Sequence, residues 1–583
     1  MRPLDWLVLC ASLAGIVLYG IWKGRRSRDL DDYLVADRSM RWHHVALSIM
    51  ATQASAITFL STPGQGYADG MRFVQFYLGL PVAMVVLSIT VVPVYRRLKV
   101  YTAYEYLEGR FDLKTRTLAA SLFLLQRALS TGVSIYAPSV ILSVIMGWDI
   151  RLVILLIGGM VTIYTTIGGA RAVDNTNFQQ FLIIMGGMLV AFLTLVWLLP
   201  ADVSLTNALH VAGKLGRLNA IDFSFKLDAH YHFWQPRFWA GFNEQYNFWS
   251  GLVGGCFLAL SYFGTDQSQV QRYLTGESVT QSRLGLLFNG LVKVPMQFFI
   301  LLLGAMVFAF YQFTQPPIFH NPVEVNKVLS SPHAAEFRAL EAQYGEAFTI
   351  KRDEARKLAA AIDAGADGER ARAENALQMS QILSDEIRAD AIKLIKENDP
   401  DANTSDTNYV FLNFVIHFMP AGVVGLIFAA VFFASMSSTA SALNALASTT
   451  VIDVYRRLVK RDGNDRSYFI FSKLATVFWG AFSVAFAEYA GHLGSLIEAV
   501  NRLGSLFYGT MLGIFLLAFY FKRIGGTATF VGAIIGEAVV LYCFFYTPLA
   551  FLWYNVVGAL VVIIAALALN PLLHRDEKVR AAG

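Results

Sequence analysis

Hydroxyl side chains form a stripe inside a long uncharged segment of the chain. Residues 421–452 contain no charged side chain, yet residues 434–441 are mostly serine, threonine and alanine. At helical spacing Ser437, Ser441, Asn444 and Ser448 fall on one face, and Ala434 and Ser438 lie beside it. Hydroxyl and carbonyl oxygens are the ligands that a hard cation such as sodium takes, but small residues also let membrane helices approach closely. The stripe is therefore either a cation site or a packing surface.

The composition places this stripe in a membrane protein. Of 583 residues, 55% are hydrophobic, 14% aromatic and 15% charged. The apolar runs are continuous and long enough for membrane helices, whereas barrel strands would show short alternating segments. The net charge of +5 says little, because the position of charges matters more than their sum. Three cysteines, Cys10, Cys256 and Cys543, lie in apolar runs, which indicates neither a disulfide framework nor a metal site.

Apolar runs predict thirteen membrane crossings. They cover residues 4–22, 43–62, 73–95, 117–147, 150–168, 178–199, 240–264, 284–312, 411–450, 467–487, 495–520, 526–547 and 550–570. The first run lacks an A-x-A cleavage signal and is expected to be a retained helix. Basic clusters alternate with the crossings so that all fall on one side, at residues 25–28, 96–99, 171, 272, 456–461, 522–523 and 575–580. The positive-inside rule then predicts a cytoplasmic C-terminus and an external N-terminus in the cell (inner) membrane.

Two crossings are expected to be interrupted. Polar residues crowd positions 43–62, and Pro63–Gly66 follows, where we expect the helix to break. The seventh crossing carries several glycines and then Gly264–Gln267 near its inner end. Paired interruptions mark transport sites, and these two lie five crossings apart. Crossings two to six and seven to eleven are therefore expected to form an inverted repeat.

The expected organisation follows from these crossings. The parts are an N-terminal extra helix and loop (1–42), a first repeat (43–200), an outer loop (201–239), a second repeat (240–320 and 409–523), an outer insertion (321–408) and C-terminal extra helices with a short tail (524–583). The insertion is charge-rich from Ala334 to Asn398 and broken at Ala364–Gly368, which predicts a soluble hairpin of two amphipathic helices. A solvated lid is favoured over a partner-docking element.

Four stretches of the sequence together carry a family resemblance: Pro93–Leu98 with Thr102–Phe111, Thr265–Tyr273, the serine stretch through Asp453–Tyr455, and Phe515–Arg523. They resemble the sodium:solute symporter family, whose members carry sugars, monocarboxylates, iodide, proline and sialic acid. The likeness is to solute carrier 5-like members, including the bacterial sodium/galactose transporter branch. It implies an all-α polytopic membrane protein with a LeuT-type 5+5 inverted-repeat core, about 13 transmembrane helices, and alternation between outward-open and inward-open states.

The resemblance also implies a sodium site. The family's site takes backbone oxygens from the broken second crossing and from the eighth core helix, together with two adjacent hydroxyls. The matching positions here are Ala51, Ala54, Ala434, Ser437 and Ser438. Each of these residues would supply an uncharged oxygen atom, which suits a hard cation. The interpretation of the serine stripe as a cation site is therefore favoured.

A second sodium site, present in some members, departs from its pattern in this chain. The pattern is Thr-Asp-x-x-Gln on the sixth crossing, and Asn177 stands here in place of the acid. Asp174 lies nearby and Ser441 keeps one hydroxyl, although an acid at Asp174 also suits a helix start. One sodium per cycle is therefore expected rather than two.

The resemblance to the sugar carriers of the family also implies substrate residues. In those carriers the sugar is contacted by a lysine on the eighth crossing and by an acid or amide that precedes a glutamine on the seventh. The matching residues are Lys293, Asp266 and Gln267. A lysine inside a bilayer is costly and indicates function, unless its side chain extends to the interface.

Three further substrate positions depart from the sugar pattern. Thr58 replaces a glutamine, Gln75 or Tyr77 stands at a glutamate position, and Asn501 replaces another glutamine. A galactose carrier in the strict sense is therefore doubtful.

The expected function is import of a small polar solute driven by sodium. A sugar or polyol is the first expectation, and a monocarboxylate, sialic acid or an amino acid is the alternative. A cation channel or a transporter-like sensor is less favoured, and an enzyme is not expected because no nucleophile–base–acid set appears at membrane depth. The expected partners are the solute, sodium and the lipid bilayer, with neither nucleic acid nor an obligate protein partner. The exact solute, the oligomeric state and the role of the insertion stay open.

Overall fold

The computed structural model describes residues 2–24, 42–53, 55–98, 102–168, 177–224, 241–274, 276–460 and 465–581, and the elements assigned there are helices. The main helices of the bundle are α1 (Pro3–Gly24), α3 (Trp42–Gln53), α4 (Ala56–Asp69), α5 (Leu80–Leu98), α7 (Leu113–Met146), α8 (Ile150–Gly168), α10 (Asn177–Trp197), α12 (Gly255–Gly264), α14 (Val279–Phe313), α19 (Val423–Thr449), α20 (Asp465–Ala490), α21 (Leu496–Tyr520), α22 (Gly526–Tyr546) and α23 (Phe551–Ala581). The remaining elements are η2 (Gly70–Tyr77), α6 (Ala103–Arg110), α11 (Leu205–Lys214), η4 (Ser250–Gly254), α13 (Gln267–Leu274), α15 (Pro322–Leu329), α16 (Ala334–Asp363), α17 (Asp367–Asn398), α18 (Thr407–Phe418), η5 (Thr450–Val459) and η6 (Gly491–Leu493).

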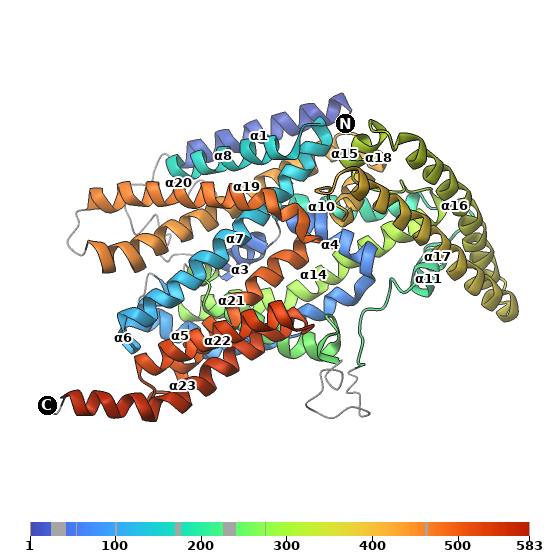
Figure 1. Ribbon diagram of the computed structural model, residues 1–583. Helices are drawn as coiled ribbons and strands as arrows, with labels where there is room; N and C mark the ends of the chain where they lie inside the picture. Colours follow the sequence, from blue (N-terminus) through green and yellow to red (C-terminus); the bar gives the residue numbers. More distant parts are fainter. Residues whose placement is uncertain are drawn as a thin grey trace.

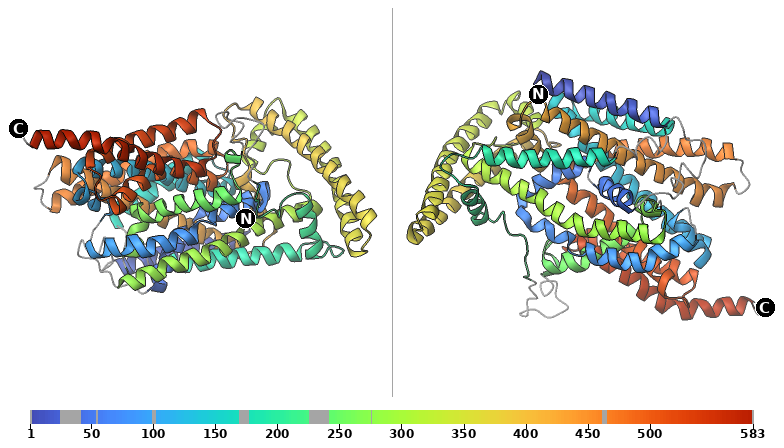
Figure 2. Two further views of the ribbon diagram at one scale, coloured as in Figure 1. Left: turned by 90° about the horizontal axis from the view of Figure 1, so that it is seen from below. Right: turned by 180° about the vertical axis from the view of Figure 1, so that it is seen from behind.

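The bundle helices run side by side, and the α16–α17 hairpin projects from one end (Figure 1). We call this end the hairpin side and the opposite end, where the C-terminus lies, the basic side (Figure 2). Eight helices in the described part of the chain are long and apolar enough to cross a membrane, and four shorter apolar helices fall within other expected crossings. α1 packs against α19, whereas α22 and α23 pack against α21.

The second crossing is interrupted, but the expected break at Pro63–Gly66 was wrong. α3 ends at Gln53, Ser55 is extended with ψ −179°, and α4 then runs without interruption through Pro63 to Asp69. The break therefore lies two turns before the proline, next to Ala54, which is outside the described residues. A proline is tolerated inside a membrane helix when neighbouring elements satisfy the freed backbone groups.

The glycines after Pro63 serve close packing instead of a break. A Cβ atom on Gly64 would lie 1.9 Å from the carbonyl oxygen of Thr407 on α18. A Cβ atom on Gly66 would lie 2.4 Å from the carbonyl oxygen of Leu301 on α14. Sequence reading took these residues for chain breakers because glycine is typical of both situations.

The apolar run at 411–450, expected as one crossing, forms two helices. α18 ends at Phe418, Met419 is extended with φ −79° and ψ 155°, and α19 begins at Val423. Pro420 disfavours a helical conformation at Met419, and Gly422 has φ +85°, which glycine adopts readily. The backbone nitrogen of Gly422 donates to Asp5 Oδ1 at 2.6 Å, so α1 caps the start of α19.

The break expected in the seventh crossing is confirmed. η4, a π-helix, and α12 lead to Gly264, and α13 begins again at Gln267, which leaves Thr265 and Asp266 between them. This interruption lies five crossings after the one between α3 and α4, as an inverted repeat requires.

A buried arginine ties three elements together on the basic side. Arg116 on α7 is 1% exposed, and its guanidinium lies 2.5 Å from Asp453 of η5 and 2.5 Å from Glu108 of α6. Thr102 also donates to Asp453, at 3.0 Å. A charge buried to this extent needs such partners, so the cluster holds α6, α7 and η5 in one arrangement.

The two helices expected between residues 334 and 398 are α16 and α17. They pack along each other and are joined near Gly365, which has φ +64°. Apolar side chains of the hairpin pack against α11, α14 and α15. The hairpin is thus held against the hairpin-side ends of bundle helices.

We expect Gly304→Ala to destabilise the contact between α4 and α14. The added Cβ would lie 2.0 Å from the carbonyl oxygen of Pro63, so a backbone must shift, at a cost of roughly 1–3 kcal/mol. Gly186→Ala on α10 is the matched control, because no atom lies within 4 Å of its Cβ position. Thermal unfolding of the purified proteins should show a lower midpoint for Gly304→Ala alone. Equal midpoints would contradict the close packing.

Candidate functional site

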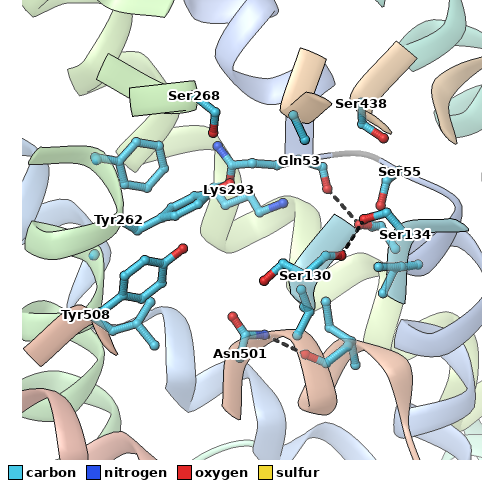
Figure 3. Close-up of a pocket in the computed structure, with 18 of the residues that line it drawn as sticks. Gln53, Ser55, Ser130, Ser134, Tyr262, Ser268, Lys293, Ser438, Asn501 and Tyr508 are labelled. Carbon is cyan, nitrogen blue, oxygen red and sulfur yellow. Dashed lines mark hydrogen bonds between the residues drawn. The ribbon is translucent and has the colours of Figure 1, made fainter. Parts of the chain in front are cut away.

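A cavity of about 160 Å³ lies in the middle of the bundle. It is bounded by the broken pair α3–α4 and by α7, α12, α14, α19 and α21. Figure 3 shows Ser55 and Ser438 at one end of the cavity, Tyr262 and Tyr508 at the other, and Lys293 extending between them. Both interrupted crossings contribute to its wall, so the cavity is where a transported solute and cation could meet.

An ion pair lies in the wall of the cavity. Arg127 on α7 donates through Nη2 to Asp266 Oδ2 at 2.5 Å and to the hydroxyl of Ser268. Asp266 is fully buried and also accepts from the Tyr508 hydroxyl at 3.2 Å. The Arg127 Nε atom is buried without a hydrogen-bond partner, so part of the guanidinium stays available to a ligand.

Lys293 brings a second positively charged side chain to the cavity. It is 2% exposed, lines the cavity and therefore does not extend to the membrane interface. Its Nζ lies 5.8 Å from the ring centroid of Tyr77, and the described part of the chain offers it no ion-pair or hydrogen-bond partner. Asp266 thus pairs with Arg127, while Lys293 has no carboxylate partner among the described residues, in a site largely shielded from water.

Polar residues of α7 form a face that the sequence reading missed. Gln126, Arg127, Ser130 and Ser134 all line the cavity. Gln126 donates to Ser130 at 2.9 Å and leaves its own Oε1 without a partner. The available signal was a lone arginine within the apolar run at 117–147, which is costly in a bilayer and marks a functional position.

One of the residues expected to bind sodium, Ser438, lines the cavity together with residues of the break. Ala434 and Ser437 are buried on α19, and Ser438 lines the cavity with Gln53 and Ser55. α19 packs against both α3 and α4. Ala51 belongs to the last turn of α3, and Ala54 is outside the described residues.

One residue expected for a second cation site, Ser441, contacts a positively charged side chain. The Ser441 hydroxyl accepts a hydrogen bond from the Arg272 guanidinium, which puts a positive charge next to it. Asn177 is the first residue of α10, and Asp174 is outside the described residues.

Five of the expected substrate residues line the cavity or contact a residue that does. Thr58, Tyr77, Lys293 and Asn501 line the cavity, and Asp266 lies behind Arg127. Thr58 donates to the carbonyl oxygen of Gln53 at 2.7 Å, across the break.

Gln75 and Gln267 lie outside the cavity lining, contrary to expectation. The Gln75 amide donates to the carbonyl oxygen of Tyr246 at 3.2 Å and accepts from the backbone nitrogen of Asp222 at 2.8 Å. Gln267 accepts from the backbone nitrogen of Ala103 at 2.9 Å. Their amides hold irregular backbone, and a sequence pattern alone does not distinguish this role from solute binding.

The sequence profile of the sodium:solute symporter family matches residues 33–337 and 386–536. The chain belongs to this family. The symporter is 25% identical to a sodium/sialic acid symporter of Proteus mirabilis, over 98% of this chain and 95% of that protein. It is 26% identical to sodium-coupled monocarboxylate transporter 1 of Xenopus laevis, over 92% of this chain and 71% of that protein.

A solved structure shares the fold of the symporter. It shows a Na⁺-coupled sialic acid symporter in a substrate-bound outward-open state, with a TM-score of 0.71, 23% identity, and 98% of each chain covered. The symporter is therefore an all-helical membrane protein with the LeuT-type 5+5 fold expected from sequence, and sodium is its coupling ion.

We expect Thr58→Val to weaken the response of the symporter to sodium. Valine keeps the shape of threonine but removes the donor to Gln53, and an unpaired buried carbonyl costs roughly 1–3 kcal/mol. Thr58→Ser, which keeps the hydroxyl, is the control. Thermal unfolding with and without sodium should show a reduced sodium-dependent shift in Thr58→Val and a normal shift in Thr58→Ser. A full shift in both would exclude a role for this hydrogen bond.

Proposed function

We propose that the symporter uses the sodium gradient to import a small organic anion, of the monocarboxylate or sialic acid class. The observation that carries the proposal is the charge of the central cavity, where Arg127 is paired with Asp266 but Lys293 has no ion-pair partner among the described residues. An uncompensated buried cation is costly, and a bound carboxylate would offset this cost. Arginine also binds carboxylates with two parallel hydrogen bonds.

The class of the anion follows from the same charges. An amino acid brings its own ammonium group and leaves the excess positive charge in place, so it fits less well. Relatives that carry sialic acid or monocarboxylates are consistent with an acidic solute. The proposed ligands for the carboxylate are Arg127 and Lys293.

A neutral sugar or polyol, the first expectation from sequence, is the second candidate. It is supported by the neutral polar groups of the cavity, among them Ser130, Tyr262 and Asn501, which can bind hydroxyl groups. Thr58 and Tyr77 would then contact the solute as expected from sequence. Under this alternative the charge of Lys293 has no partner, which is why it ranks second.

The proposed sodium ligands are the carbonyl oxygens of Ala51, Ala54 and Ala434 and the hydroxyls of Ser437 and Ser438. Support comes from the packing of α19 against both halves of the broken helix. A cation bound there would join α19 to α3 and α4, so its binding and release would favour different states of an alternating-access cycle.

We propose one sodium ion per cycle. The Arg272 guanidinium beside Ser441 disfavours a second cation by like-charge repulsion, and Asn177 supplies no negative charge.

We further propose that the symporter lies in the cell (inner) membrane with its basic side in the cytoplasm. Arg96, Arg97, Arg456 and Arg457 lie at the basic-side ends of α5 and η5. The positive-inside rule then puts the α16–α17 hairpin on the outer surface.

The proposal predicts that transport is electroneutral. A monovalent anion carried with one sodium ion moves no net charge, whereas a neutral solute would gain about fiftyfold accumulation from a potential of about 100 mV. Sodium-dependent thermal stabilisation against monocarboxylates, sialic acid, sugars and polyols identifies the solute. Its uptake into liposomes is then measured with and without an imposed potassium diffusion potential. A strong response to the potential would favour the neutral solute instead.

We expect Ser438→Ala to reduce the sodium affinity of the symporter by roughly tenfold or more, because a cation loses one of its oxygen ligands. Ser448→Ala, on the same helix ten residues further along, is the matched control. Sodium titrations of solute uptake in liposomes measure both variants. An unchanged sodium dependence of Ser438→Ala would remove this hydroxyl from the cation site.

A further inference from the structure

A second cavity, of about 150 Å³, lies where the α16–α17 hairpin meets the hairpin-side ends of α4, α14 and α18. Its charged lining consists of Arg217, Lys351, Arg388, Asp385 and Asp406. Three cations thus face two carboxylates, which leaves one excess positive charge. This cavity is separate from the central one, and the two have no lining residue in common.

Both carboxylates have hydrogen-bond partners other than Arg217 and Lys351. Asp406 accepts from Arg388 Nη2 at 2.5 Å and from the backbone nitrogen of His320 at 2.8 Å. Asp385 is exposed and accepts from Gln381 at 2.9 Å. Within the described residues, neither carboxylate forms an ion pair with Arg217 or Lys351.

Lys351 and Arg217 keep unused hydrogen-bonding capacity. Lys351 is 3% exposed, and its ammonium makes one long hydrogen bond, of 3.4 Å, to the side chain of Gln381. The Arg217 guanidinium lies 4.6 Å from the ring centroid of Phe308, and its buried Nε has no hydrogen-bond partner. The buried Nε of Arg388 also lacks one. These donors come from three different segments and border one cavity.

The electrostatics agree with this geometry. Burial lowers the pKa of Lys351 to about 8, and burial also lowers the pKa of Arg217. Both groups are still mainly protonated at neutral pH. Water could satisfy their donors, but it would leave the excess charge uncompensated.

We propose that this cavity binds a small monovalent inorganic anion, held by Lys351, Arg217 and Arg388. The anion would connect the hairpin to the bundle, because α4 contributes Tyr67 and Ala68 to the same lining. The carbonyl oxygen of Arg217 also accepts from the backbone nitrogen of Met71 at 3.1 Å, directly after α4. Occupancy would therefore fix the hairpin-side end of the half-helix whose other end borders the central cavity. The site does not depend on the identity of the transported solute.

Chloride is the probe for the test. Purified full-length protein is titrated with radioactive chloride at constant sodium, with gluconate replacing chloride. We expect saturable binding of one chloride per chain in the wild type. Lys351→Met, which keeps the length of the side chain without its charge, should bind chloride roughly tenfold more weakly or worse. Lys357→Met, on the same helix with its side chain 66% exposed, should bind as the wild type does.

Folding is checked by the sodium-dependent shift in thermal unfolding, which Lys351→Met should retain because the central cavity is unchanged. Should Lys351→Met fail this check, Arg217→Gln takes its place with the same expected loss of chloride affinity. Absence of saturable chloride binding to the wild type would overturn the proposal. Equal chloride affinity in the wild type and in a folded Lys351→Met or Arg217→Gln variant would also overturn it.

Discussion

Backbone that leaves a helix inside a bilayer must find hydrogen-bond partners within the protein, because lipid supplies none. The two interruptions that border the central cavity meet that requirement with side chains. Thr58 donates to Gln53 across the first break. Tyr104 and Tyr95 donate to the carbonyl oxygens of Thr265 and Gly264 at the second. A break can therefore exist only where a nearby side chain, from the same crossing or from another element, supplies a partner.

This requirement brings the two repeats together at the centre of the molecule. The partners of the second break come from α5 and α6, while Asp266 within that break pairs with Arg127 of α7. A rearrangement of the broken segment would have to exchange these hydrogen bonds and this ion pair for others of similar strength. Discrete alternative states are thus favoured over gradual deformation, as alternating access requires.

The sequence could predict the features that depend on composition and local pattern. Apolar runs located the long apolar helices, and Gly264–Gln267 correctly marked one interruption. The break beside Ser55 was misplaced, because Pro63 and the glycines after it serve contacts with α14 and α18 that no local pattern reveals. Gln75 was misassigned for a related reason, since its amide satisfies distant backbone groups. Arg127 could have been identified from the free-energy cost of burying an arginine in a bilayer. Its ion pair with Asp266 joins residues far apart in the sequence and becomes visible only in the structure.

The contact between α1 and α19 limits which segments of this chain can be exchanged independently. Asp5 caps the backbone of Gly422, and a Cβ atom on Gly425 would lie 2.1 Å from the carbonyl oxygen of Asp5. An acid near one end of the sequence and two glycines more than four hundred residues later therefore form one packing unit. A chimera that exchanges the first helix between relatives must carry the matching residues of α19 with it.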